Sequence, residues 1–264
     1  MNNNCIEIIG LKYLNLFEDF SVAFEKEKFL TISGSNNCGK TSFIRIIDGQ
    51  VPILNTILVY GKKYEDYTIT EINTLIKSVI PLEFTKTQNT IEEELLYQIS
   101  FNTKKEIKQK RLKEIAKQFK LTKFLTRTVD NLSDELLIRL QLALAFISSP
   151  KIVLIDDLSS YFSKKDLLDI TNSIKEINKN EKITIIMITS QLECNLLSDY
   201  TYIISNGEIV LEGSPLEVLE KDNILNKAGL NLPFIMDLSV KLRDYDLIKQ
   251  IELDMDRLVD TLWN

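Results

Sequence analysis

Gly34-Ser35-Asn36-Asn37-Cys38-Gly39-Lys40-Thr41 has the pattern G-x-x-x-x-G-K-[ST], which is typical of a phosphate-binding loop. An apolar stretch precedes this loop and a helix-like segment, 41–48, follows it, which is the context that the motif requires. Gly34 and Gly39 allow backbone conformations that a Cβ atom would obstruct, so successive N–H groups can point at phosphate oxygens. Lys40 is expected to reach the β and γ phosphates, and the Thr41 hydroxyl to ligate Mg²⁺. A chance glycine-rich turn is the alternative, and the flanking elements argue against it.

Every position of this loop is a candidate nucleotide contact. The residues that we assign to nucleotide binding are Gly34, Ser35, Asn36, Asn37, Cys38, Gly39, Lys40, Thr41 and Ser42. Cys38 could act as a redox switch, but its position supplies mainly backbone to the phosphates, so we favour an ordinary role for its thiol. Lys40 is also a candidate catalytic residue, because it would contact the phosphate that is transferred.

A second motif, Ile152-Val153-Leu154-Ile155-Asp156-Asp157, consists of four apolar residues that end in two carboxylates. A buried strand places its last residue at the carboxyl edge of a parallel sheet, near a phosphate loop. Asp156 can therefore hold Mg²⁺ through water, and Asp157 is a candidate for orienting the attacking water. Buried strands often end in aspartate, so this motif alone is weak evidence for a metal site. It becomes a good candidate because the loop at 34–41 is present in the same sequence.

The composition limits the possible chemistry. A chain of 264 residues with 44% apolar content can bury a large core, on the scale of one large domain or one with a small insertion. The sequence contains no histidine, which excludes an imidazole base, a histidine metal ligand and a histidine-dependent triad. A net charge of −6 argues against a nucleic-acid binder, which normally carries a basic face.

Cysteine usage and apolar runs indicate a cytoplasmic protein. The three cysteines, Cys5, Cys38 and Cys194, are odd in number and far apart, which disfavours a disulfide framework or a zinc site. The segment 1–5 lacks the basic and apolar regions of a signal peptide. The longest apolar runs, such as 183–188, are far shorter than the ~20 residues that span a bilayer, so we expect no direct membrane insertion.

Strands alternate with helices along most of the chain. The expected strands are 6–9, 20–24, 29–33, 152–155 and 183–188, followed by a hairpin of 202–205 and 208–211 about Asn206-Gly207. The expected helices are 41–48, 136–147 and 167–177, and Ser214-Pro215-Leu216-Glu217 opens another. Residues 53–82 are interpreted as short strands and turns, and the Lys-rich block at about 90–130 as an inserted helical subdomain that starts at a Thr90/Glu93 capping box. Two continuous apolar strands predict an α/β fold with a mainly parallel sheet covered on both faces.

The order of these motifs resembles an ATP-binding cassette (ABC) ATPase of the P-loop NTPase class. The same elements follow one another in that family: the loop at 34–41, a helical insert, a Leu132-Ser133 motif that opens a helix, the carboxylate strand, and a strand ending in Ile188-Thr189-Ser190. The stretch from Tyr200 through Pro215 is similar to the end of importer-type cassettes. Residues 228–233, a helix and Leu242-Arg243 resemble the C-terminal extension of energy-coupling factor (ECF) transporter ATPases. Two ordinary amphipathic helices, with Ile248, Ile251, Met255 and Leu258 as one core stripe, are the alternative for this tail.

The resemblance implies a division into an ATP-binding domain at 1–220, with an antiparallel β subdomain and a helical subdomain at about 84–131, and a helical extension at 221–264. It also implies that Tyr13 stacks on adenine, although a core tyrosine is an equal alternative. ATP and Mg²⁺ are the implied cofactors, with Thr41 and Asp156 as the metal ligands.

Several positions depart from the family pattern. The Leu-Ser-Gly-Gly-Gln signature is Leu132-Ser133-Asp134-Glu135-Leu136 here, which would bring two carboxylates toward the ATP of a partner subunit. At an effective dielectric of about 20, one such contact at ~4 Å costs on the order of 4 kcal/mol. The same residues make a favourable helix start, with acids near the positive end of the helix dipole, so a structural role is favoured.

The catalytic positions are altered as well. Asp157 stands where the family has a glutamate, and a misplacement by ~1 Å can lower a rate about a hundredfold. Ser190 aligns with the switch histidine, and Ser163 with the aspartate of the inter-subunit loop. The γ-phosphate-sensing glutamine, expected after a strand at 78–82, is matched best by Glu83 and less well by Gln88.

These residues lead to two hypotheses. The first is an ATP-binding subunit of an ECF-type importer that supports uptake of a vitamin or metal, is peripheral on the inner face of the cell membrane, and works with a second ABC ATPase subunit and a transmembrane coupling subunit. Because a homodimer would repeat the defective signature at both sites, a heterodimer is favoured. The second is a catalytically inactive pseudo-ATPase that serves as a scaffold or regulatory partner. A soluble P-loop kinase is a weaker alternative, because it leaves the cassette order unexplained.

Overall fold

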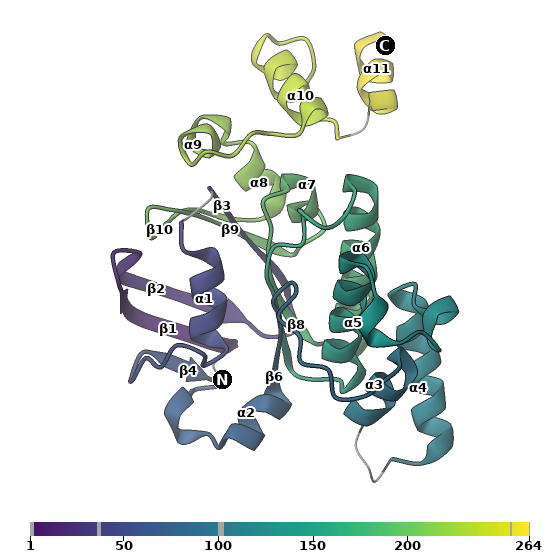
Figure 1. The fold of residues 1–264 in the computed structure, drawn as a ribbon. Helices are drawn as coiled ribbons and strands as arrows, with labels where there is room; N and C mark the ends of the chain where they lie inside the picture. Colours follow the sequence, from purple (N-terminus) through teal and green to yellow (C-terminus); the bar gives the residue numbers. More distant parts are fainter. Residues whose placement is uncertain (1–2, 36–37, 100–102, 254, 264) are drawn as a thin grey trace.

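The computed structural model describes residues 3–35, 38–99, 103–253 and 255–263. Its centre is a six-stranded sheet with the strand order β10-β9-β3-β8-β7-β6 (Figure 1). The strands are β3 Phe29–Gly34, β6 Ile76–Val79, β7 Ile152–Ile155, β8 Thr184–Ile188, β9 Tyr200–Ser205 and β10 Glu208–Gly213. All neighbours in this sheet are parallel except β10, which pairs with β9 in the antiparallel direction. The predicted α/β class with a mainly parallel sheet is confirmed.

A second, antiparallel sheet has the order β2-β1-β4-β5. Its strands are β1 Asn4–Tyr13, β2 Phe17–Glu25, β4 Ile57–Val59 and β5 Lys62–Lys63. Buried and exposed residues alternate along much of β2, as expected for a strand that packs one face on the core and leaves the other in water. Both predicted N-terminal strands are therefore correct in type, but each extends further at both ends than the apolar residues alone indicated.

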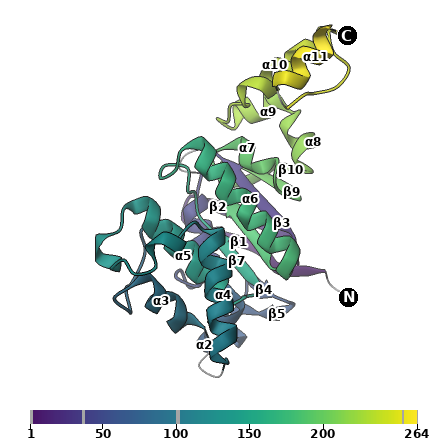
Figure 2. The same ribbon diagram turned by 90° about the vertical axis from the view of Figure 1, so that its right-hand side faces the viewer.

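Helix α1, Lys40–Ile47, lies between the two sheets (Figure 1). Its buried residues Phe43, Ile44, Ile46 and Ile47 belong to one apolar cluster with residues of both sheets. The opposite face of the large sheet is covered by α5, Asp134–Ile147, and α6, Lys164–Glu181 (Figure 2). This face forms a second cluster that extends into the helical region. The large sheet is thus buried on both sides, which is why its central strands are apolar without alternation.

The helical region between β6 and β7 begins with α3, Ile91–Gln98, and α4, Lys105–Gln118. The predicted capping box is present, because the Thr90 hydroxyl accepts from the Glu93 N–H and the Glu93 carboxylate accepts from the Thr90 N–H. Leu112, Ile115 and Ala116 of α4 are buried, as their spacing predicted. Two short 3₁₀ turns, Thr122–Phe124 and Val129–Asn131, follow α4 in this region, and another, Tyr64–Asp66, lies before β6.

Two details upstream of this region differ from the prediction. Residues 53–82 contain a helix, α2 Ile69–Leu75, which starts at a Thr68/Glu71 capping box that the sequence interpretation missed. The following strand, β6, spans Ile76–Val79 and not 78–82, because Leu82 has the positive φ of a turn.

The C-terminal part contains α7 Leu192–Asn195, α8 Pro215–Leu219, α9 Asp222–Lys227, α10 Phe234–Asp244 and α11 Met255–Trp263. Its apolar residues Leu225, Leu230, Met236 and Val240 pack in a third cluster with Leu192 of α7 and Ile203 of β9. The suggested single stripe is wrong, because Ile248 and Ile251 precede α11 in a segment without helix. Among the described residues, every helix is too short or too polar to cross a membrane.

Candidate nucleotide-binding site

The phosphate loop connects the end of β3 to the start of α1. Gly39, the residue before α1, has φ +93°, and a Cβ atom there would lie 3.0 Å from Cζ of Phe17. At Gly34 a Cβ atom would lie 2.3 Å from the carbonyl oxygen of Ile204. Both positions therefore require glycine. Asn36 and Asn37, assigned to nucleotide binding from the sequence, lie outside the described residues.

Lys40 crosses this loop with its side chain. Its ammonium donates to the carbonyl oxygens of Gly34 at 2.8 Å and Ser35 at 2.7 Å, and approaches Sγ of Cys38 at 3.7 Å. The positive charge is therefore held at the loop backbone, next to the N-terminus of α1, where the helix dipole also favours an anion. Cys38 is buried, and Thr41 and Ser42 lie in the first turn of α1, with the Thr41 side chain exposed.

The candidate metal ligands offer oxygen atoms of the kind that Mg²⁺ prefers. Asp156 directly follows β7 and is 5% exposed; its Oδ1 accepts from the Asp157 N–H at 2.8 Å. Its Oδ2 makes no hydrogen bond with another described residue. The described residues contain no cluster of three or more His, Cys, Asp or Glu suited to a metal. A carboxylate and a hydroxyl without further protein ligands suit an ion whose remaining ligands are phosphates and water.

Asp157 joins the ends of two adjacent strands. Its Oδ1 accepts from the Ser159 N–H at 2.9 Å, and its Oδ2 accepts from the Ser190 N–H, also at 2.9 Å. The hydroxyls of Ser159 and Ser190 are themselves 2.8 Å apart. The structure therefore brings together two of the three catalytic candidates, Asp157 and Ser190, and orients the carboxylate by bonds to its own chain.

The two glutamine-position candidates occupy different places. Glu83 forms an ion pair with Arg45 of α1, one turn beyond Thr41. Gln88 donates its backbone N–H to Oε1 of Glu94 at 2.6 Å, in the loop before α3. Of the two, Glu83 is thus tied to the helix that carries the phosphate loop.

Two buried polar side chains that the sequence interpretation missed hold this connection in place. Gln141 donates to the carbonyl oxygens of Ile80 at 3.0 Å and Glu83 at 2.9 Å, while its Oε1 accepts from the Leu82 N–H at 3.3 Å. Glu94, only 1% exposed, accepts from Thr87 and Gln88. A polar residue at a core-facing position of an apolar helix was the available signal for Gln141.

The segment at 132–136 begins α5. The Ser133 hydroxyl accepts from the Leu136 N–H at 3.4 Å, and Glu135 forms a salt bridge with Arg139 at 2.9 Å. Arg139 also lies over the ring of Phe162, 5.2 Å from its centroid. Ser163 caps α6 in the same way, accepting from the Asp166 N–H at 3.1 Å. These contacts agree with the structural role that the sequence favoured for this segment.

Tyr13 ends β1, and the turn that follows it lies against the phosphate loop. Its ring is partly buried and packs on the cluster around α1. Its carbonyl oxygen accepts from the Leu16 N–H at 3.1 Å, and the side chains of Leu16 and Phe17 border Gly39. The tyrosine thus ends the strand that leads into this turn, and core packing is the role that its contacts show, while adenine stacking stays a prediction.

This chain is similar in sequence to known proteins. Residues 17–160, more than half of the chain, match the family model described as ABC transporter. A curated relative, the energy-coupling factor transporter ATP-binding protein EcfA of Pediococcus pentosaceus, is 28% identical over 96% of this chain and 94% of its own length. EcfA1 of Geobacillus kaustophilus is 23% identical over 98% of this chain and 95% of its own length.

Solved structures show the same fold. The cbiO1 protein of Clostridium perfringens, part of the ABC transporter complex cbiONQ, superposes with a TM-score of 0.72 and 20% identity, over 92% of this chain and all of that chain. A bacterial Atm1-family ABC exporter with ATP bound superposes with a TM-score of 0.73 and 18% identity, over 86% of this chain and 42% of that chain. With its phosphate loop, carboxylate strand and family match, this chain belongs to the ABC transporter family and has the ABC ATPase fold.

Proposed function

We propose that the chain is an ATP-binding subunit of an ECF-type importer, in which nucleotide binding supports micronutrient uptake across a membrane. The observation that carries this proposal is the phosphate loop, with the Lys40 ammonium held 2.7–2.8 Å from two loop carbonyls at the head of α1. The importer type is supported by the relatives, which are named energy-coupling factor transporter ATP-binding proteins and match nearly the full length of the chain.

In this proposal, residues 1–220 form the ATP-binding domain, with the helical subdomain at about 84–131, and residues 221–264 form a helical extension. The loop residues 34–42 surround the phosphates, and Tyr13 stacks on adenine. Thr41 and Asp156 hold Mg²⁺, which would neutralise phosphate charge.

Hydrolysis at this site is proposed to be slow. Asp157 is shorter than the glutamate that orients water in the family, and both of its oxygens already accept backbone N–H groups. Ser190 can donate a hydrogen bond but cannot carry the positive charge of a histidine. The residues that would bind the phosphates thus match the family pattern, whereas the residues that would activate water do not.

A second ABC ATPase subunit with an intact signature would complete the second site, so we propose a heterodimer. Asp134 and Glu135 are exposed at the start of α5, where a homodimer would place acids at both sites. The pair would dock on a transmembrane coupling subunit at the inner face of the membrane. The proposal includes no nucleic-acid partner and no direct membrane insertion of this chain.

The first experiment tests nucleotide binding. Lys40→Ala removes the charge at the phosphate loop, and we expect it to abolish ATP binding measured by isothermal titration calorimetry. Lys151→Ala is the matched control, since it removes an exposed lysine before β7 and leaves the loop intact. Unchanged ATP affinity of the Lys40 variant, with a normal melting temperature, would contradict the nucleotide proposal.

A second candidate function, a pseudo-ATPase scaffold, is favoured by the bonds that occupy the Asp157 carboxylate. ATP hydrolysis by the assembled complex with Asp157→Asn distinguishes an ATPase subunit from a pseudo-ATPase scaffold. A loss of ATP hydrolysis indicates that Asp157 contributes to turnover. Unchanged hydrolysis together with retained ATP binding supports the scaffold role instead.

A further inference from the structure

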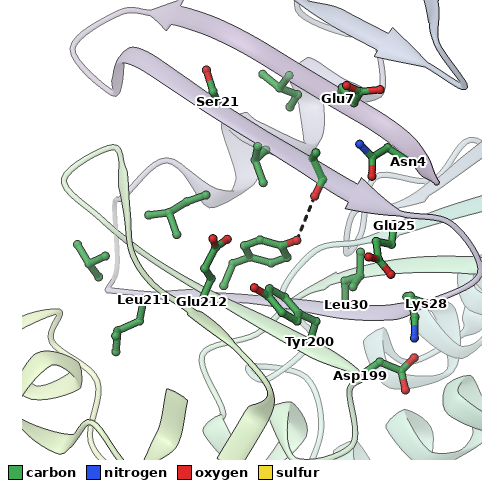
Figure 3. Close-up of a pocket in the computed structure, with 16 residues that line it drawn as sticks. Asn4, Glu7, Ser21, Glu25, Lys28, Leu30, Asp199, Tyr200, Leu211 and Glu212 are labelled. Carbon is green, nitrogen blue, oxygen red and sulfur yellow. Dashed lines mark hydrogen bonds between the residues drawn. The ribbon is translucent and has the colours of Figure 1, made fainter. Parts of the chain in front are cut away.

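A groove lies between the two sheets, away from the phosphate loop. Its volume is about 930 Å³, and its lining comes from β1, β2, β3, β9 and β10. β2 and β10 are the end strands of their sheets, so two strand edges border the same groove (Figure 3). None of the described residues in the 34–42 loop lines it. The ABC ATPase assignment therefore leaves this groove without a role.

Two tyrosines of β9 line the inner part of the groove. The rings of Tyr200 and Tyr202 are tilted, with centroids 5.1 Å apart. The Tyr202 hydroxyl donates to the carbonyl oxygen of Ala23 in β2 at 3.1 Å, marked by the dashed line in Figure 3. This bond fixes the buried Tyr202, while Tyr200 stays partly exposed to the groove. A partly exposed tyrosine ring can hold a cation over its face.

Carboxylates surround these rings. Four acidic side chains line the groove and only one lysine, Lys28, opposes them. Asp199 is engaged, because its Oδ2 accepts from the Phe29 N–H at 2.9 Å. Among the described residues, Glu25 and Glu212 have no hydrogen-bond or ion-pair partner for their side chains. Burial, followed by the charges of Glu212, Glu217 and Glu25, raises the pKa of Tyr200, so the negative potential extends to its ring.

The shape of the groove indicates which kind of cation fits. The groove is open to solvent and is not an enclosed cavity, whereas a small-molecule site encloses most of its ligand. Strand edges carry backbone groups that pair with an added extended segment. Leu211 and the exposed Val210 add apolar contact from β10. Charge, aromatic surface and open edges together match an extended polypeptide that carries cationic side chains.

We propose that the groove between β2 and β10 docks an extended, lysine- or arginine-containing segment of a partner polypeptide. A cationic side chain lies over Tyr200 between Glu25 and Glu212, and the neighbouring side chains contact Leu211. This inference is independent of the proposed nucleotide function, because the groove and the phosphate loop share no described residue.

The experiment uses the full chain and a fluorescein-labelled nine-residue peptide of alternating lysine and valine, followed by fluorescence anisotropy. We expect saturable binding that the double variant Glu25→Gln/Glu212→Gln weakens about tenfold, since two close charge contacts are lost. Tyr200→Leu keeps an apolar side chain, although a smaller one, and removes the ring face, and is expected to weaken binding about threefold. Glu208→Gln is the matched control, because Glu208 belongs to β10 but does not line the groove.

Each outcome decides the proposal. Equal binding of a peptide with glutamate in place of lysine, or unchanged affinity of the double variant, would overturn it. Full displacement of the peptide by an equal concentration of spermine would also overturn it, in favour of a small-cation site. ATP titrations of the same variants should remain unchanged, which separates this result from the test of nucleotide binding.

Discussion

At the scale of single residues, the Asp157 carboxylate has a structural role that its position in the sequence does not predict, because it accepts hydrogen bonds from two backbone N–H groups. Asp157→Ala leaves the N–H groups of Ser159 and Ser190 without their acceptor in a partly buried site. We expect a loss of about 1–3 kcal/mol in the free energy of unfolding, measured by urea denaturation. Ser160→Ala, at an exposed position nearby, is the control. If Asp157→Ala were as stable as the parent, these bonds would not contribute to the fold.

A comparison of Gly39 with Gly61 separates two costs of adding a Cβ atom, namely backbone strain at positive φ and steric contact with a neighbouring side chain. Both have positive φ, +93° and +78°, but a Cβ atom at Gly39 meets Phe17, whereas nothing lies within 4 Å of one at Gly61. Gly61→Ala should lower stability by about 1 kcal/mol through backbone strain alone. Gly39→Ala should cost more and also weaken ATP binding, as thermal denaturation and calorimetry would show. Equal effects of the two changes would mean that the contact with Phe17 is relieved freely.

The buried thiols of Cys5 and Cys194 make stability depend on alkaline pH. Burial raises the pKa of each to about 11, from 9.0. The thiols of the unfolded chain ionise at a lower pH than the buried thiols of the folded chain. The free energy of unfolding that the two neutral, buried thiols contribute is therefore fully present below pH 9 and is lost as pH rises through about 11. Each pKa unit corresponds to about 1.4 kcal/mol. Urea midpoints measured between pH 8 and 11 should fall, and Cys5→Ala/Cys194→Ala should flatten that slope. A slope unaffected by the double change would assign it to other groups.

At the scale of elements, Gln141 connects α5 to the turn after β6. Gln141→Leu preserves the size of the side chain and removes three hydrogen bonds to Ile80, Leu82 and Glu83. We expect a loss of about 1–3 kcal/mol and faster amide hydrogen exchange at residues 80–83. Gln118→Leu, at the last residue of α4, is the comparison variant. Unchanged exchange at 80–83 would show that other contacts hold the turn.

Elements could be predicted from the sequence where periodicity and capping signals coincide. The strands β7 and β8 and the helices α1, α5 and α6 were identified, and the Ser133, Thr90 and Ser214 starts are confirmed by their side-chain bonds. Helix α2 was missed because only Ile72 of its seven residues is buried, so it has no apolar stripe. Its Thr68/Glu71 signal was present but lay in a segment interpreted as turns.

The candidate site could be predicted in part. The loop and the two carboxylates follow local patterns, and the structure places them at the ends of β3 and β7, the two strands that flank β8. The Asp157–Ser190 contact joins residues 33 positions apart, and no local pattern indicates which N–H group a carboxylate will accept from. The same limit applies to Gln141, whose partners lie about 60 residues away.

At the scale of the whole molecule, the C-terminal residues belong to the core and do not form a detached tail. Leu225, Leu230 and Met236 are at most 5% exposed and pack with Leu192 and Ile203. Removing residues 221–264 should therefore cost at least about 3 kcal/mol and lower the melting temperature by roughly 6–12 °C. Removing only 255–264, of which Leu258 is the one described buried residue, is the comparison and should cost less. Equal melting temperatures for the parent and the longer deletion would contradict this packing.

The phosphate loop is bounded by three separate regions of the chain. Phe17 of the antiparallel sheet borders Gly39, Ile204 of the large sheet borders Gly34, and a Cβ atom at Gly229 would lie 3.1 Å from Cβ of Ser35. Any displacement of this loop by a nucleotide must be accommodated at all three boundaries. Because thermodynamic linkage is reciprocal, a force that shifts the C-terminal region changes nucleotide affinity by the same factor by which the nucleotide opposes that shift. The affinity for ATP would then change with any interaction that displaces the C-terminal region.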